Sequence, residues 1–144
     1  MNKNYEYWLS YGGLDPETRR ERESISGNEE EIEARFAKPM QFGTAGLRSI
    51  MAAGISRMNV YTVAQTTQAL ANLICRCGEQ ARGVAIAYDS RIKSTLFAQT
   101  AASVFAANGV LVHLYSELMP TPALSYAVRA LSCNGGIVVT ASHN

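Results

Sequence analysis

The segment 140–144, Thr-Ala-Ser-His-Asn, has side chains suited to a phosphoryl-transfer site. It overlaps the end of a β-branched apolar run, 137–140, which predicts a buried strand. The hydroxyl of Ser142 would then be presented at the carboxyl end of that strand, the edge where loops and helix N-termini of a parallel sheet converge. Taken alone, the segment is more typical of a plain polar turn than of a catalytic loop.

A serine hydrolase is disfavoured by the same residues. His143 directly follows Ser142, and adjacent side chains on extended backbone point to opposite sides, so the two cannot easily form a nucleophile–base pair. The GxSxG motif is also absent, because Thr140 stands two residues before the serine. Phosphoryl transfer therefore fits the segment better than hydrolysis.

Two arginines could bind a phosphate group. Arg48 follows a glycine-rich stretch, and Gly43 and Gly46 allow backbone shapes that would aim its planar guanidinium into a cleft. Arg91 lies close to Asp89, just after a predicted strand. Each has an ordinary alternative: Arg48 as a surface residue, and Arg91 as a partner of Asp89 across the loop.

The elements that must position these side chains form a repeating pattern. Apolar runs over 84–88, 110–114 and 137–140 predict strands. Between them, helical spacing predicts one helix that begins near Ser94, a potential N-cap, and a second that begins at Thr121. This β-α-β-α-β order predicts a mostly parallel α/β sheet with right-handed crossovers and covering helices. The loops that follow the strands, 89–91, 117–121 and 140–144, should share one edge of the sheet.

The first part of the chain predicts short, charged helices. Tyr5, Trp8 and Leu9 share one helical face, and Asp15 is suited to cap a helix that begins at the proline after it. A further helix over 29–38 starts with three glutamates, which the helix dipole favours in a first turn, so a metal site is the weaker interpretation.

A glycine-rich segment follows these helices. Residues 42–54 predict a loop or hairpin, and apolar residues from Val60 to Ile74 predict a helix of about five turns. We therefore expect a helical extension over 1–40 and an α/β domain over 41–144.

Composition and charge limit the classes of partner that this chain could bind. A formal charge of +1 gives no broad basic face for nucleic acid, no stretch is long enough to span a membrane, and residues 1–5 lack the apolar core of a signal peptide. We expect a cytoplasmic protein that binds a small molecule. Three cysteines, 75, 77 and 133, lack disulfide-like or CxxC spacing and are predicted to be reduced packing residues.

Five segments, in order along nearly the whole chain, resemble the α-D-phosphohexomutase family, in its phosphoglucomutase and phosphomannomutase branch. The two most distinctive are Phe-Gly-Thr-Ala-Gly-Leu-Arg at 42–48 and Thr-Ala-Ser-His-Asn at 140–144. The other three lie at 57–63, 87–91 and 119–122.

The resemblance implies a reaction and a role for each site residue. Ser142 would be the phosphoserine that gives its phosphoryl group to a hexose phosphate and recovers another from the resulting 1,6-bisphosphate. Arg48 would stabilise the charge on the transferred phosphoryl group, and His143 would act as an acid or base or as a hydrogen-bonding partner. Thr44, Arg91 and Asn144 would help to bind phosphate.

The family also implies a cofactor and an activator. Mg²⁺ would bind the phosphoserine oxygen together with aspartates that this chain lacks, and glucose 1,6-bisphosphate would act as activator. The chain resembles domain I alone, cut at the phosphoserine loop, so we expect it to lack mutase turnover without the remaining domains.

Some choices stay open at the level of sequence. The form of the 42–48 segment favours glucose 1-phosphate as substrate, with mannose or pentose phosphates as alternatives. A non-catalytic phosphate-binding α/β module and an inert fragment are rival interpretations. Ala45 and Ser49 occupy positions where relatives commonly have glycine, which affects local backbone geometry more than identity.

Overall fold

The computed structural model describes residues 2–44 and 46–140. The chain divides into two compact units, Met1–Thr62 and Val63–Asn144. Each unit has its own buried apolar cluster. These units are defined by packing and do not test the predicted division into an extension over 1–40 and an α/β domain over 41–144. That division stays a prediction.

The second unit is built on a parallel sheet of order β4-β3-β5. Its strands are β3 (Val84–Tyr88), β4 (Val112–Leu114) and β5 (Gly135–Val139). The central strand β3 pairs in parallel with both neighbours. The predicted parallel α/β sheet is therefore confirmed.

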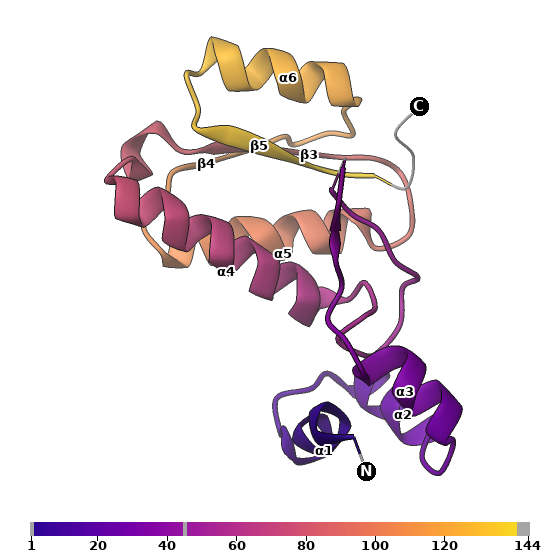
Figure 1. The fold of residues 1–144 in the computed structure, drawn as a ribbon. Helices are drawn as coiled ribbons and strands as arrows, with labels where there is room; N and C mark the ends of the chain where they lie inside the picture. Colours follow the sequence, from indigo (N-terminus) through magenta and orange to yellow (C-terminus); the bar gives the residue numbers. More distant parts are fainter. Residues whose placement is uncertain (1, 45, 141–144) are drawn as a thin grey trace. The chain divides into compact units, whose positions relative to one another are not determined.

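Helices cover both faces of this sheet (Figure 1). The helices α4 (Val60–Cys77) and α5 (Ser94–Ala107) lie on one face, and α6 (Thr121–Ala130) lies on the other. A short 3-10 turn, η1 (Gln80–Arg82), precedes β3. The α/β/α layering buries every residue of β3, which explains why its sequence is apolar throughout and does not alternate.

Alternate residues of β3 enter different clusters. Val84, Ile86 and Tyr88 join residues of α4 and α5, whereas Ala85 and Ala87 join residues of α6. The β3 side chains on the α6 face are therefore small and those on the other face are larger, and each face must be filled by side chains of complementary volume.

Three details of this unit differ from the sequence prediction. The strand β4 begins at Val112 rather than 110, because the Val110 N–H bonds to the Phe105 carbonyl and the Leu111 N–H bonds to that of Gln80, outside the sheet. Ser94 is the first residue of α5 rather than its cap, and Lys93 holds the cap position with φ 64°. The strand β5 spans Gly135–Val139 rather than 137–140, because Gly135 and Gly136 already pair with Val84 and Ala85 of β3.

The first unit contains the predicted short helices, α1 (Lys3–Ser10), α2 (Pro16–Ser24) and α3 (Glu29–Phe36), although α3 ends two residues before the predicted bound at 38. Tyr5 and Trp8 are buried and contact Phe36 edge-on, with ring centroids 5.2 and 5.4 Å from its ring. Leu9 was expected on the same face but is 44% exposed. A helix turns by about 100° per residue, so Leu9 is displaced by that angle from Trp8 around the helix axis. The two aromatic side chains, and not Leu9, make the contact with α3.

A hairpin follows the helices, as the glycine-rich segment predicted. The strand β1 (Phe42–Gly43) pairs antiparallel with β2 (Gly46–Leu47). Gly46 has φ +127°, a conformation that L side chains rarely adopt, so glycine is required there. The chain then returns through an isolated bridge between Met51 and Met58.

All three cysteines are free thiols, and Cys133 is buried whereas Cys77 is exposed. Burial raises the pKa of the Cys133 thiol, although the positive charge of Arg82 opposes this. A raised thiol pKa is expected of a packing residue.

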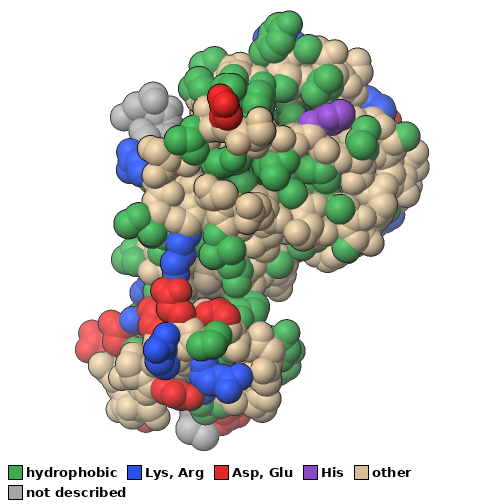
Figure 2. Space-filling view, turned by 180° about the vertical axis from the view of Figure 1, so that it is seen from behind, with side chains coloured by type: hydrophobic (Ala, Val, Ile, Leu, Met, Phe, Trp, Pro, Cys, Tyr) green, Lys and Arg blue, Asp and Glu red, His purple; other side chains and the backbone are tan. Residues whose placement is uncertain are grey.

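Acidic and basic side chains are interspersed over the N-terminal helices (Figure 2). Among the described residues, no helix combines the length and apolar character needed to cross a bilayer.

Candidate active site

The described parts of the loops that follow β3, β4 and β5 lie at one edge of the sheet, as predicted. The Asp89 N–H donates to the Val139 carbonyl at 3.1 Å, so the loop after β3 lies against the end of β5. The Met119 N–H donates to the Tyr88 carbonyl at 3.1 Å, which brings the loop after β4 to the same edge. Half-buried Thr140 directly follows β5 at this edge.

The Asp89 carboxylate organises the loop after β3. Its Oδ1 atom accepts a hydrogen bond from the Ser94 hydroxyl at 2.6 Å and another from the Arg91 N–H at 3.0 Å. Ser94 is only 3% exposed, and this bond ties the start of α5 to the end of β3. The hydroxyl that was predicted to cap α5 is thus used to hold the loop closed. The Arg91 side chain is exposed.

The hairpin of the first unit carries the other predicted phosphate-binding residues. Thr44 lies in the turn between β1 and β2, and Arg48 directly follows β2. Both are exposed. Within the described part of the chain, the Arg48 guanidinium makes no hydrogen bond or ion pair. A charged group without an internal partner is available to bind an anion.

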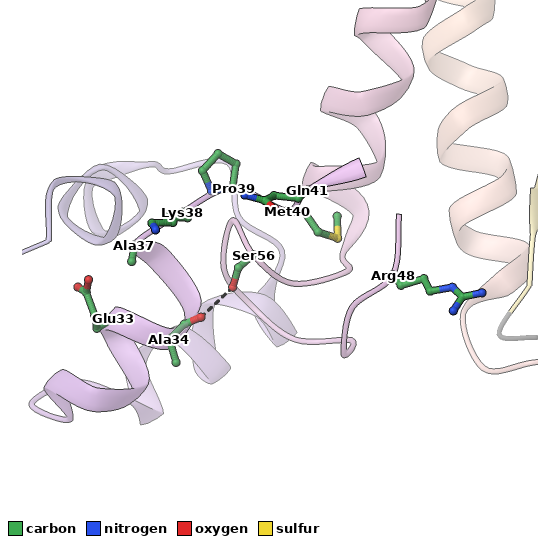
Figure 3. A pocket seen from close by; sticks show the side chains of 9 residues that line it. All are labelled: Glu33, Ala34, Ala37, Lys38, Pro39, Met40, Gln41, Arg48 and Ser56. Carbon is green, nitrogen blue, oxygen red and sulfur yellow. Dashed lines mark hydrogen bonds between the residues drawn. The ribbon is translucent and has the colours of Figure 1, made fainter. Parts of the chain in front are cut away.

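An open pocket of about 430 Å³ lies in the same unit, between the end of α3 and the hairpin segment. Figure 3 shows that the Arg48 guanidinium points away from the other side chains around it. The pocket is lined by Glu33, Ala34, Ala37, Lys38, Pro39, Met40, Gln41, Arg48 and Ser56. The Arg48 charge is therefore not directed into this pocket.

Three of the predicted site residues lie outside the described residues. These are Ser142, His143 and Asn144. Their roles stay predictions, as does the relation of Ser142 to Arg48. Their loop begins where the β3 and β5 ends meet, since Thr140 directly precedes it.

One structural residue of the hairpin region was missed at the level of sequence. Asn59 is buried, and its Oδ1 accepts hydrogen bonds from the N–H groups of Tyr61 and Thr62, while Thr62 Oγ1 accepts one from the Asn59 N–H at 3.1 Å. This reciprocal arrangement is a capping box at the start of α4. An asparagine three residues before a threonine, ahead of a helical pattern, is a signal that could have revealed it.

The Asn59 side chain also holds the loop that leads to α4. Its Nδ2 donates to the carbonyls of Ala52 and Gly54, both at 2.9 Å. Each amide hydrogen and the carbonyl oxygen of this side chain are used, which is the arrangement expected of a buried polar group.

The comparisons with known proteins agree with this architecture. Residues 39–144 match the family model described as "Phosphoglucomutase/phosphomannomutase, alpha/beta/alpha domain I". No solved structure matches the chain significantly.

Several curated relatives carry mutase names. A phosphopentomutase of Mus musculus is 45% identical over 130 residues, covering 82% of this chain and 20% of the relative. A phosphoglucomutase of Staphylococcus saprophyticus is 42% identical over 116 residues, covering 81% and 21%. A glucose 1,6-bisphosphate synthase of Homo sapiens is 37% identical over 147 residues, covering 95% and 24%. The chain thus spans between a fifth and a quarter of these relatives' length, and it belongs to the phosphoglucomutase/phosphomannomutase family.

Proposed function

We propose that this chain is the phosphoserine-bearing domain of a phosphohexomutase that moves a phosphoryl group within a hexose phosphate. Ser142 carries the phosphoryl group between turnovers. The family match supports this, because it extends through the whole 140–144 segment. The observation that carries the proposal is the bond between the Asp89 N–H and the Val139 carbonyl, which sets the start of that segment beside the Asp89–Arg91 loop.

The reaction proceeds in two balanced halves. The bond between phosphorus and Ser142 Oγ breaks as a bond to the free sugar hydroxyl forms; the proton of that hydroxyl passes to a base, and the released Ser142 Oγ takes up a proton. In the second half, the bond between the other phosphoryl group and its sugar oxygen breaks as a bond to Ser142 Oγ forms, Ser142 gives up its proton, and the sugar oxygen takes up a proton. Catalysis of such transfers rests on positioning and on stabilising charge on the equatorial oxygens.

The remaining site residues take the roles that this chemistry requires. His143 handles the proton beside Ser142, and Arg48 supplies a permanent positive charge to the transferred group. Thr44, Arg91 and Asn144 contribute donors to phosphate oxygens. The family motif supports these assignments, and so does the Arg48 guanidinium, which has no partner among residues 2–44 and 46–140.

A Mg²⁺ site is not complete within the described residues. No group of three or more histidine, cysteine, aspartate or glutamate side chains among residues 2–44 and 46–140 could hold a metal ion. Mg²⁺ requires about six oxygen ligands in octahedral array. We propose that the Ser142 phosphate supplies one oxygen and that the other ligands come from further domains of the full enzyme. Complete turnover needs both transfers and a filled Mg²⁺ site, so we expect the 144-residue chain alone to show no mutase turnover, whereas a single slow transfer from a bisphosphate to Ser142 is still expected.

We propose glucose 1-phosphate as the substrate, glucose 1,6-bisphosphate as the activator and a cytoplasmic location. The names of the relatives cover pentose phosphates and glucose 1,6-bisphosphate as well as glucose phosphate chemistry. Mannose and pentose phosphates are therefore the alternatives to include in any test.

The test is transfer of a phosphoryl group to the 144-residue chain. The protein is incubated with Mg²⁺ and either glucose 1,6-bisphosphate, mannose 1,6-bisphosphate or ribose 1,5-bisphosphate, and its intact mass is measured. We expect one added phosphoryl group, located at Ser142 by fragmentation and formed fastest from the glucose compound. Ser142→Ala should gain none, and Arg48→Lys should gain it more slowly because it lacks the bidentate fork.

Two outcomes contradict the proposal. A wild-type chain that binds the bisphosphates without gaining mass would be a non-catalytic phosphate-binding module. Equal labelling of the wild-type and Ser142→Ala chains would place the accepting group elsewhere.

A further inference from the structure

The residue after Arg48 is tied to a second loop. The Ser49 hydroxyl donates to the Ser56 carbonyl at 2.6 Å. Ser49 is half-buried, whereas Arg48 is exposed. Since the Arg48 side chain has no internal partner in the described residues, the backbone on which it stands decides where its charge lies.

The loop that receives the Ser49 hydroxyl is held by the N-terminal helices. Ser56 donates through its N–H to the Arg35 carbonyl at 3.1 Å. Its hydroxyl donates to the Ala34 carbonyl at 2.9 Å, the bond that Figure 3 marks with a dashed line. The Ala53 N–H donates to Glu21 Oε2 at 2.9 Å. Two separate helices, α2 and α3, therefore bind the same loop.

The side chain of Arg35 links these two helices. Its Nη1 donates to Glu21 Oε1 and its Nε donates to Glu31 Oε2, both at 2.8 Å. The Arg35 side chain is only 16% exposed, so the pairs are better shielded from water than an ordinary surface ion pair. Burial tends to lower the pKa of Arg35, but the bonds to Glu31 and Glu21 outweigh it and raise the pKa. The guanidinium is thus charged at all working pH values.

Gly54 lets the loop approach α3 closely. A Cβ added there would lie 2.8 Å from Arg35 Cβ and 2.8 Å from the Arg35 carbonyl oxygen, and Gly54 has φ +131°. Only glycine fits both the backbone conformation and the space. The contact between the loop and Arg35 is therefore fixed in distance as well as in hydrogen bonding.

We propose that Glu21, Arg35 and Ser49 are positioning residues that fix the backbone carrying Arg48, and so the place of its guanidinium, for phosphoryl transfer. The carboxylate of Glu21 holds both Arg35 and the loop, and Ser49, the residue next to Arg48, links that loop to the Arg48 backbone. Catalytic groups displaced by about 1 Å can lose rate on the order of 100-fold. This inference rests on the proposed role of Arg48.

The test compares variants by the rate at which Ser142 gains a phosphoryl group from glucose 1,6-bisphosphate. Ser49→Ala and Glu21→Gln remove one link each, and Ser49→Thr keeps the hydroxyl. Glu79→Gln is the matched control, because Glu79 also pairs with an arginine, Arg82, but lies in the other unit. All rates are measured at a temperature where circular dichroism shows each variant fully folded.

We expect Ser49→Ala and Glu21→Gln to slow labelling about tenfold at saturating bisphosphate. Ser49→Thr should restore the rate, and Glu79→Gln should leave it unchanged. Loss of rate in a folded variant and rescue by a hydroxyl are effects that a purely stabilising role would not produce. Hydrogen exchange of the Ala53 and Ser56 amides should also quicken in Glu21→Gln.

The outcomes separate this inference from the proposed function. Normal labelling in Ser49→Ala and Glu21→Gln, together with slow labelling in Arg48→Lys, overturns the positioning role and leaves the mutase role standing. Absence of labelling in the wild-type chain overturns the mutase role, and with it the proposed positioning role of Glu21, Arg35 and Ser49 in catalysis. Unchanged amide exchange in Glu21→Gln would overturn the structural link itself.

Discussion

Gly136 lies in β5 at a point where α6 leaves no room for a side chain. A Cβ built there would be 2.8 Å from Val128 Cγ2 and 2.9 Å from Leu124 Cδ1, and 3.1 Å from the Ala85 carbonyl oxygen. We expect Gly136→Ala to lower the free energy of unfolding by about 1–3 kcal/mol, because the Val128 and Leu124 side chains must shift to accept the methyl group. Urea denaturation followed by circular dichroism measures the change.

The neighbouring glycine is the control for that substitution. A Cβ at Gly135 would have no heavy atom within 4 Å. Gly135→Ala should therefore change stability by less than about 0.5 kcal/mol. Equal effects of the two substitutions would mean that α6 does not set the requirement at Gly136.

The site residues differ in how far sequence could predict them. Arg48 and Thr44 lie in the hairpin that glycine spacing predicted, and the loop after β3 lies at the predicted edge of the sheet. Glu21 and Arg35 could not be recognised in the same way, because 14 residues separate them along the chain and their partner Ala53 is 32 residues from Glu21. No short motif encodes such contacts, which arise only when three segments pack together.

Asp15 shows how one residue can define the start of a helix. Its Oδ1 accepts hydrogen bonds from the N–H groups of Glu17 and Thr18, both at 3.0 Å, and its Oδ2 accepts one from the Tyr61 hydroxyl at 3.0 Å. Burial alone would raise the pKa of Asp15, but the bonds from Thr18, Tyr61 and Glu17 outweigh it and lower the pKa below 3.8. The ionised carboxylate is therefore the form that the folded chain prefers.

A lowered pKa in the folded state makes the contribution of Asp15 depend on pH. It is fully present above pH 3.8, the ordinary value, and is lost as the pH falls through the lower folded value. We expect Asp15→Ala to cost about 1 kcal/mol at neutral pH, as typical for a lost N-cap. Urea denaturation at pH 7 and at successively more acidic pH should show this difference shrink.

The control for Asp15 retains the cap without the charge. Asp15→Asn keeps a side-chain oxygen for the Glu17 and Thr18 N–H groups, so it should lose less stability than Asp15→Ala at neutral pH. It should also lose the pH dependence that comes from this carboxyl group. A constant difference between wild type and Asp15→Asn across the acidic range would contradict the lowered pKa.

Helices and central strands were easier to predict than the ends of elements. The helix α4 covers 18 residues, as the repeat of apolar side chains indicated, and β3 has the predicted bounds. The start of β4 was wrong by two residues, because apolar character does not tell whether a backbone N–H bonds within the sheet or to a neighbouring turn. Ser94 was wrong as a cap because its hydroxyl has a better partner in Asp89.

The whole chain has separate apolar clusters on either side of the Thr62–Val63 division. Phe36 is fully buried in the cluster of the first unit, and Phe105 is fully buried in one of the second. The division falls within α4, so the helix is continuous while the clusters are not. Substitutions in each core should accordingly act first on their own unit.

We expect Phe36→Leu to raise amide exchange mainly within 2–62 and Phe105→Leu mainly within 63–140. Each loses contacts of a fully buried ring and should cost about 1–2 kcal/mol locally, because the smaller side chain leaves part of the cavity unfilled. Hydrogen exchange with mass spectrometry, read peptide by peptide, measures both patterns. Tyr126→Leu is the control, since this aromatic side chain is 67% exposed and should change neither pattern. Equal loss of protection across both units from either core substitution would show that they unfold as one cooperative body, because a shared transition exposes every amide at the same free energy.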